Sequence, residues 1–322
     1  MAMSGQLCVD VLTVGLTYRD LIFTGVEALP RPGEERYAQD LHEMWGGIAT
    51  MARVCGALGM STALGTAVGS DDASTRLLDD MAAAGVDTSL TQRHDGWRLP
   101  VTAAMSLPGD RAMLTVEDPL PVDVAAHLDG ADLRAGSIIV DLRDPAAPWL
   151  QRARAQGSTV FASRGFDPTE QWGDDALAGL GGTDVWMLND LEAKAFTGLD
   201  DPLAAARQLA QRVPLVVVTR GPAGMVAADA TTGETTSTAA FPVTPRSTTG
   251  AGDSTLAALC FARSHPGATL GEHLMLAAFI ASAVLASPGG AATPPTIDEL
   301  IALAAHGEDP RLPHVRALLG RG

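Results

Sequence analysis

The sequence predicts an α/β fold in which a mostly parallel sheet carries helices on both faces. From residue 122 onward, short aliphatic runs alternate with stretches of helical periodicity, which is the order of elements that builds such a sheet. With 46% hydrophobic residues, a chain of 322 residues also has ample material for a large core. The predicted strands span residues 138–141, 159–162, 185–188 and 215–219, and the predicted helices span 146–156 and 203–212.

The composition excludes several classes of protein. Acidic residues number 38 against 22 Lys and Arg, and the net charge of −16 argues against a nucleic-acid or membrane-surface partner. The single lysine, Lys194, excludes both a Walker-type phosphate loop and the strand lysine of protein kinases. Any bound phosphate must therefore be held by backbone amides, arginines or a metal.

Cysteine use and apolar runs predict the compartment. Three widely spaced cysteines fit neither a disulfide framework nor a zinc cage, which indicates a reducing environment. Residues 1–6 carry no secretion signal, and the most apolar run, 274–286, is shorter than the roughly 20 residues that cross a bilayer. We therefore expect a cytoplasmic protein in which residues 274–286 form a buried helix.

The pattern of the N-terminal third predicts two features: a strand that ends in a loop, and a separate β-hairpin. Residues 7–14 form an aliphatic run ending at Gly15, so Asp20 is expected in the loop beyond it, where α/β proteins bind ligands. Asp20 is there either a solvated acid or an acceptor for the hydroxyl groups of a diol. Residues 93–116 predict a hairpin around the turn Pro108-Gly109-Asp110.

Glycines and polar residues mark further turns and helix starts. Gly46-Gly47 precedes a predicted helix over 48–58 and is either a plain hinge or cap, or a point of close approach to a ligand. Asn189 with Glu192 three positions later predicts a capping box. Residues 219–224 predict a turn with no helix after it, which argues against the dinucleotide fingerprint of dehydrogenases.

The segment Ser247-Thr248-Thr249-Gly250-Ala251-Gly252-Asp253 predicts an anion site. Apolar residues at i, i+3 and i+4 from Leu256 indicate that a buried helix follows the glycines. The first N–H groups of a helix have no internal partner and the helix dipole is positive there, so a phosphate can sit on residues 250–252. Asp253 either complements this dipole or accepts a proton from a group that attacks the phosphate.

These segments resemble the motifs of one enzyme family, the PfkB or ribokinase-like carbohydrate kinases. The last segment is similar to the signature D-T-x-G-A-G-D at six of seven positions, with Ser247 in place of the first Asp. The stretch from Gly46 resembles the first signature, G-G-x-x-x-N-x-A, with Met51 at the Asn position and Ala52 after it. The remaining motifs follow in the family's order at residues 65–71, 189–192, 219–224 and 287–292.

The resemblance implies the family's architecture and activity. It implies a single ribokinase-like domain over residues 1–322, with a small β-sheet lid built from about 16–44 and 92–118. In members of the family, this lid closes over the substrate and often pairs two subunits, so the resemblance implies a possible homodimer. The implied activity is ATP-dependent phosphorylation of a primary hydroxyl of a sugar or sugar derivative.

The resemblance also implies a role for each matched residue. Gly250, Ala251 and Gly252 would form the hole for the transferring phosphoryl group, and Asp253 would remove the hydroxyl proton. The other implied contacts are Asp20, Gly46, Gly47 and Met51 for the substrate, Asn189, Thr219, Gly221, Gly224 and Thr249 for the nucleotide, and Asn189 with Glu192 for Mg²⁺, largely through water.

Two departures from the family leave alternatives open. Met51 cannot bond a hydroxyl as Asn does, which keeps open a nucleoside kinase of the adenosine type. Ser247 calls into question activation by K⁺, to which family members often respond. Together the two departures also leave open a catalytically retired sugar-sensing protein, whereas the retained Asp253 favours an active kinase.

Overall fold

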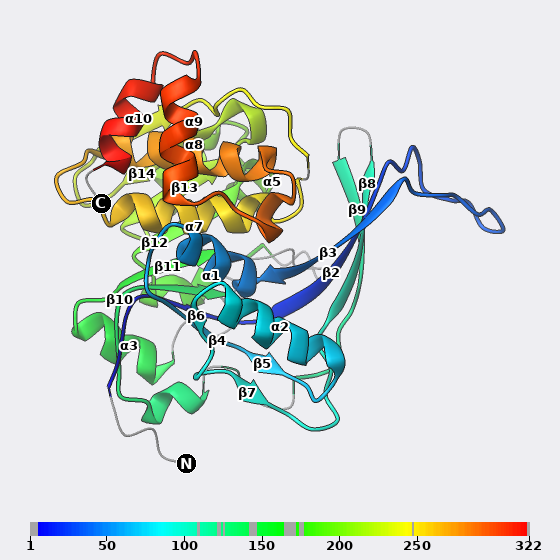
Figure 1. Cartoon of the computed structure of the whole chain (residues 1–322). Helices are drawn as coiled ribbons and strands as arrows, with labels where there is room; N and C mark the ends of the chain where they lie inside the picture. Colours follow the sequence, from blue (N-terminus) through cyan, green and yellow to red (C-terminus); the bar gives the residue numbers. More distant parts are fainter. Residues whose placement is uncertain are drawn as a thin grey trace.

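A nine-stranded sheet forms the centre of the described structure (Figure 1). The computed structural model describes residues 6–107, 110–120, 124, 126–141, 147–163, 172–173, 177–246 and 248–320, so Ser247, Pro108-Gly109 and Ala146 lie outside it. The strand order is β15-β14-β13-β12-β11-β10-β1-β4-β6, and only β14 and β15 run antiparallel to their neighbours. The predicted fold class is confirmed. The strands are β1 (Leu7–Val14), β4 (Thr62–Gly65), β6 (Val86–Asp87), β10 (Leu133–Asp141), β11 (Thr159–Ser163), β12 (Val185–Asn189), β13 (Leu215–Thr219), β14 (Met225–Asp229) and β15 (Thr235–Thr238).

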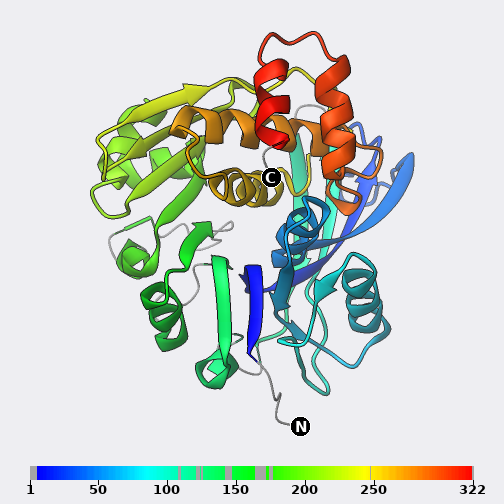
Figure 2. The same ribbon diagram turned by 60° about the vertical axis from the view of Figure 1, so that its left-hand side comes forward.

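Both faces of this sheet are covered, because successive strand residues point to opposite sides. Val11 and Ile139 join one hydrophobic core, whereas their neighbours Leu12 and Ile138 join the other. Helices α1, α2, α7 and α8 close the first core, and α3, α5 and α6 close the second. Figure 2 shows the C-terminal helices, orange to red, gathered on one side of the molecule. The helices are α1 (Ile48–Ala57), α2 (Asp72–Ala83), α3 (Pro148–Ala155), α5 (Asp190–Thr197), α6 (Pro202–Leu209), α7 (Ala251–Arg263), α8 (Leu270–Ala286), α9 (Ile297–His306) and α10 (Leu312–Leu319).

A second, four-stranded sheet projects from the main body, on the right in Figure 1. In it β2 (Thr17–Thr24) pairs antiparallel with β3 (Asp40–Gly47) and parallel with β8 (Val101–Leu107), which pairs antiparallel with β9 (Asp110–Val116). The predicted hairpin is therefore present as β8 and β9. Asp20, expected in a loop, lies within β2, because pairing with a strand on each side extends the chain here. The role of this sheet as a lid stays a prediction.

Local signals set most helix ends. The predicted capping box begins α5, where Asn189 Oδ1 accepts from Glu192 N at 2.8 Å and Glu192 Oε2 accepts from Asn189 N at 2.9 Å. Pro148 and Pro202 occupy the first turns of α3 and α6, since a proline there loses no helical hydrogen bond. The apolar run 274–286 lies in α8 and is largely buried. In the described part of the chain, no helix combines the length and apolar character needed to cross a membrane.

Candidate active site

The candidate site lies at the carboxyl ends of the central parallel strands. Strands β1, β10, β11, β12 and β13 pair parallel, so the residues that end them, or follow at once, share one edge of the sheet. Asn189 pairs with Thr219 at this edge, and a Cβ built on Gly15 would lie 2.9 Å from the Cβ of Asp141. Open α/β sheets bind ligands at such an edge.

Gly250 turns the chain into α7 at this edge. It is the N-cap residue, with φ 76° and ψ 10°, a left-handed conformation that favours glycine. The Ala251 N–H donates to the Thr248 carbonyl at 3.3 Å, whereas a Cβ built on Gly252 would meet nothing within 4 Å. The positive end of α7 therefore faces open space at Gly252, which supports the predicted anion site.

Asp253 stands in the first turn of α7 and is partly buried. The Gly47 N–H, at the start of α1, donates to this carboxyl. Burial raises the pKa of Asp253 to about 7, the negative charges of Asp20 and Asp141 act in the same direction, and Arg111 opposes them. A carboxyl with this pKa exchanges a proton near neutral pH, which a residue serving only the helix dipole does not need to do.

Asp20 lies on β2 beside the glycine pair and is buried. Burial raises its pKa to about 6, while a hydrogen bond from Thr102 acts against this rise. A Cβ on Gly46 would overlap Asp20 Oδ2, and a Cβ on Gly47, whose φ is 62°, would overlap the Leu16 carbonyl oxygen. The two glycines are therefore more than a hinge, because they admit the Asp20 carboxyl and the tight start of α1.

One face of the small sheet carries further polar groups that sequence reasoning missed. Directly paired residues share a face, and Thr102 pairs with Asp20 and with Thr115, whose hydroxyl is 3.0 Å from that of Thr102. By the same alternation, Arg111, which pairs with Ser106, lies on this face. Only the strand register shows that these residues share a face, and the sequence alone does not determine that register. Asp141 could have been predicted from the sequence, since it ends a predicted parallel strand.

The predicted nucleotide residues occupy the neighbouring part of the edge. Thr219 ends β13, and Gly221 begins a short turn with φ 52°, where an added Cβ would meet nothing within 4 Å. A Cβ on Gly224 would overlap the Thr238 carbonyl oxygen, so this glycine allows β14 and β15 to approach. Gly224 therefore has a structural role whether or not it meets a nucleotide.

The family follows from a comparison of the whole sequence. Residues 9–297 match the family model described as pfkB family carbohydrate kinase, which is far more than half of the chain. The chain belongs to this family. It is accordingly a phosphotransferase of the carbohydrate kinase type, as the order of its motifs predicted.

Solved structures of other kinases share the fold of this pfkB family chain. Ribokinase from Arabidopsis thaliana, complexed with ribose and ATP, has a TM-score of 0.73 at 18% identity, covering 92% of this chain and 99% of that one. Fructokinase from Xylella fastidiosa with bound ATP and a nucleoside kinase from Methanocaldococcus jannaschii each have a TM-score of 0.72 at 20% identity, covering 92% of this chain and 98% of theirs.

Two of the predicted site residues of this pfkB family kinase are buried. Met51 lies in α1 with 4% of its surface exposed and belongs to the first hydrophobic core. Thr249, also 4% exposed, directly precedes the Gly250 turn. Their contacts with a substrate or nucleotide stay predictions.

Proposed function

We propose that the protein transfers the terminal phosphoryl group of ATP to a primary hydroxyl of a sugar or sugar derivative. The observation that carries this proposal is the position of Asp253, a carboxyl with a pKa of about 7 in the first turn of a helix whose N-terminus faces open space. A proton acceptor and an anion site are thereby adjacent, which is the combination that phosphoryl transfer to an alcohol requires.

In the proposed mechanism Asp253 is the general base. Its carboxylate takes the proton of the substrate hydroxyl as the oxygen bonds to phosphorus and the bond to the ADP oxygen breaks. The Gly47 N–H orients the carboxyl, and the N–H groups at the start of α7 stabilise negative charge on the transferring group. A pKa near the working pH suits this role, because the base is then ionised yet still basic.

Asp20 is proposed to bind the other hydroxyl groups of the substrate. Its carboxyl is fixed by the Thr102 hydroxyl and by the absence of a side chain at Gly46. An ionised carboxylate accepts hydrogen bonds from vicinal hydroxyls, so it selects substrates that carry them. The small sheet would then close over the substrate as a lid.

The residues proposed for Mg²⁺ fit an ion that keeps most of its water. The capping box engages the single side-chain oxygen of Asn189, through one lone pair, and one of the two carboxylate oxygens of Glu192. No cluster of three or more metal-ligating side chains occurs among the described residues. Mg²⁺ is usually bound by one or two carboxylates and substrate phosphates, with several waters retained. When bound, it would neutralise phosphate charge. Asn189 and Glu192 would orient its waters.

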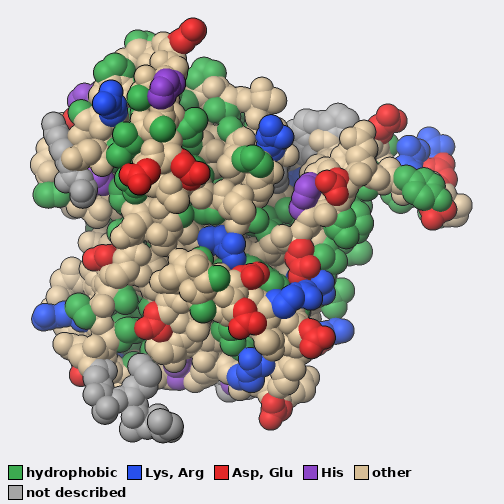
Figure 3. All heavy atoms as spheres, viewed as in Figure 1, with side chains coloured by type: hydrophobic (Ala, Val, Ile, Leu, Met, Phe, Trp, Pro, Cys, Tyr) green, Lys and Arg blue, Asp and Glu red, His purple; other side chains and the backbone are tan. Residues whose placement is uncertain are grey.

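A homodimer through the small sheet is also proposed. The face opposite Asp20 carries Leu21, Ala103 and Leu114, which are paired across three strands. Leu114 is 69% exposed, and Leu41 on β3 is 52% exposed. Figure 3 shows hydrophobic side chains gathered over this part of the molecule. A second copy of the chain would cover them, and we propose that the dimer is cytoplasmic.

A nucleoside kinase is the second candidate activity. Met51 supports it, because a buried thioether at this position makes an apolar contact where a hydroxyl-binding Asn is usual in the family. The M. jannaschii nucleoside kinase has the same fold, so the fold is compatible with both substrate classes. A retired sugar-sensing protein is disfavoured by the raised pKa of Asp253.

An ADP-release assay over pentoses, hexoses, keto sugars and nucleosides tests these candidates. ADP release with one class identifies the acceptor, and no release with any acceptor favours the sensor. Asp253→Asn should keep ATP and acceptor binding but lose roughly 100- to 10,000-fold in kcat, the usual contribution of a general base. Turnover near the wild-type rate in this variant would exclude the proposed mechanism.

A further inference from the structure

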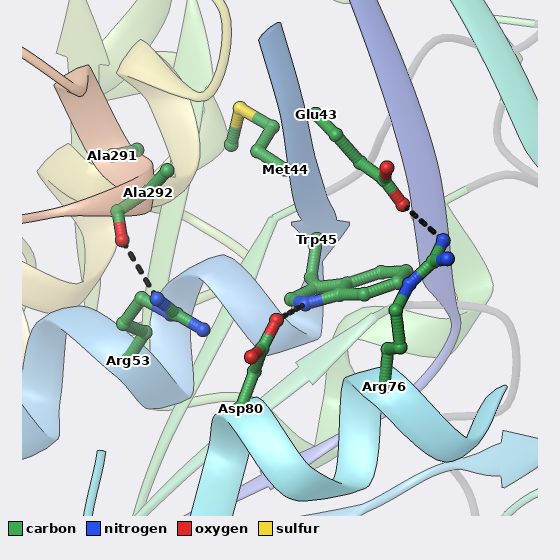
Figure 4. A pocket seen from close by; sticks show the side chains of 8 residues that line it. All are labelled: Glu43, Met44, Trp45, Arg53, Arg76, Asp80, Ala291 and Ala292. Atoms are coloured by element: carbon green, nitrogen blue, oxygen red, sulfur yellow. Dashed lines mark hydrogen bonds and ion pairs between the residues drawn. The ribbon is translucent and has the colours of Figure 1, made fainter. Parts of the chain in front are cut away.

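A cavity of about 210 Å³ lies between β3, α1, α2 and the short turn η4 (Gly290–Ala292). Figure 4 shows the eight side chains that line it. Two of them lie beside the anion-site turn, since a Cβ built on Gly250 would lie 3.2 Å from Met44 Cε and 3.3 Å from Ala291 Cβ. One wall of the cavity therefore adjoins Gly250.

Most polar and charged side chains that line the cavity bond to one another, but Arg53 bonds to the backbone on the opposite wall. Arg76 donates to Glu43 at 2.8 Å, and the Trp45 indole N–H donates to Asp80 at 2.7 Å. Arg53 instead donates from Nη1 to the carbonyl oxygen of Ala292 at 2.7 Å. Of the eight lining residues, Arg53 is the one whose side chain links a helix to η4 (Figure 4).

The guanidinium group of Arg53 is half-buried and held between two fixed elements. Burial lowers its pKa, and the negative charge of Asp80 acts against this change. Arginine stays protonated in proteins, so the bond to Ala292 is charge-assisted and directional. The turn η4 is three residues long, and its own hydrogen bonds, such as Ala292 N–H to the Gly289 carbonyl at 3.1 Å, lie within residues 287–293, whereas the bond from Arg53 ties the turn to α1.

We infer that Arg53 is a positioning residue for phosphoryl transfer, which holds η4 so that Ala291 supports the Gly250 turn. The same helix, α1, begins at Gly47, whose N–H bonds to Asp253. The helix α1 therefore positions two parts of the site: its N-terminus holds the carboxyl of Asp253, and its Arg53 holds the turn η4 behind Gly250. Arg53 itself contacts neither reacting group, and it acts through Ala292 and Ala291.

This inference rests on the proposed function and is tested with Arg53→Met, which keeps an unbranched apolar stem but no donor. We expect kcat to fall about 10- to 100-fold, the cost of a misplacement of about 1 Å, with KM for the acceptor within about twofold of wild type. The acidic limb of the pH profile should stay in place, because the contact between Gly47 and Asp253 is retained. Arg76→Met, which removes a guanidinium from the same cavity but not from η4, should keep the wild-type kcat.

A binding measurement separates this inference from the proposed function. The ratio of the affinities for a non-hydrolysable ATP analogue and for ADP, measured by calorimetry, reports how well the anion site holds the terminal phosphate. Arg53→Met should lower this ratio about tenfold or more, and Arg76→Met should not change it. If the wild type releases no ADP with any acceptor, the proposed function fails, yet this ratio still tests Arg53.

Two outcomes would overturn the inference. One is a folded Arg53→Met protein with the wild-type kcat and the wild-type affinity ratio. If Arg53→Met does not fold, Arg53→Lys takes its place, because it keeps the charge but bonds through a single shorter-reaching nitrogen. A severalfold loss of kcat at unchanged KM in Arg53→Lys supports positioning, whereas the wild-type kcat would assign Arg53 to folding alone.

Discussion

At the scale of single residues, the surroundings of Asp253 determine the pH at which it can act. Burial raises its pKa to about 7, and the carboxylates of Asp20 and Asp141 contribute in the same direction. A base works only when ionised, so we expect kcat/KM to fall as the pH drops below about 7. A profile measured between about pH 5 and 9 checks this, and one that is flat between about pH 6 and 8 would rule out Asp253 as the titrating base.

Arg111 should shift this profile in a known direction. Its positive charge lowers the pKa of Asp253, so Arg111→Met should raise that pKa and move the acidic limb of kcat/KM to higher pH. The matched control is Arg98→Met, because Arg98 pairs with Asp118 on the surface and does not act on Asp253. The acidic limb of the profile could stay in place in Arg111→Met, or it could move equally in Arg98→Met. Either result would show that Arg111 does not face the base.

Ionised Asp253 also destabilises the folded protein. Its folded pKa lies above the ordinary value of 3.8, so the folded state binds more protons than the unfolded state between about pH 4 and 7, and stability falls as the pH rises through this window. At pH 8 Asp253→Asn should therefore raise the free energy of unfolding by about 1 kcal/mol or more, since one pKa unit corresponds to about 1.4 kcal/mol. Urea unfolding at about pH 8 and pH 4 tests this, and a gain of equal size at both would contradict it.

At the scale of elements, what the sequence predicts depends on whether the cause is local. The capping box of Asn189 and Glu192 is a spacing of three residues within one helix start, and the structure contains it. Strand β1 likewise ends where the aliphatic run ends, at Val14. Asp20 was expected in a loop, because its extension depends on pairing with β3 and β8, which follow much later in the chain. Local pattern alone could not provide that pairing.

The same distinction applies to the candidate site. Glycines and acids stand out in the sequence because few residue types replace them, so Gly250, Gly46 and Asp253 could be chosen from their motifs. Arg111 and Thr102 were missed because strand register decides which face they occupy. The contact of Arg53 with Ala292 joins residues 239 positions apart, and no spacing rule reaches that far.

The start of α7 gives a test at this scale. A Cβ on Gly252 meets nothing within 4 Å, so Gly252→Ala should fold normally, with a free energy of unfolding unchanged or raised by up to about 1 kcal/mol. The added methyl group would occupy the space proposed for the phosphoryl group, so kcat should fall about tenfold or more. Gly271→Ala in the first turn of α8, with an ordinary contact of 3.4 Å to Thr236, is the control and should keep its activity. Wild-type kcat in Gly252→Ala would mean that the phosphoryl group lies elsewhere.

At the scale of the whole molecule, the small sheet has two faces that carry different side chains. The face that carries Asp20, Thr102 and Arg111 brings polar groups toward the candidate site. The opposite face carries the Arg19–Glu43 ion pair but also an apolar stretch, in which Leu114 and Leu41 are more than half exposed on a chain of net charge −16. Large exposed apolar patches of this kind usually mark interaction sites. A lid that is also an interface would link substrate closure in one subunit to the position of the sheet in the other.

Leu114→Asp tests this arrangement. A charge at this exposed position on the edge strand β9 would lose its water on association, so we expect the wild type to be a dimer at micromolar concentration and the variant to be a monomer. Light scattering after gel filtration measures the mass, and Leu303→Asp on α9, where Leu303 is 51% exposed, should remain a dimer. If closure depends on the partner, the Leu114→Asp monomer should also have a raised KM for the acceptor, with ATP affinity unchanged. A wild-type monomer would remove the interface, and an active monomer with unchanged KM would separate closure of the lid from pairing of the subunits.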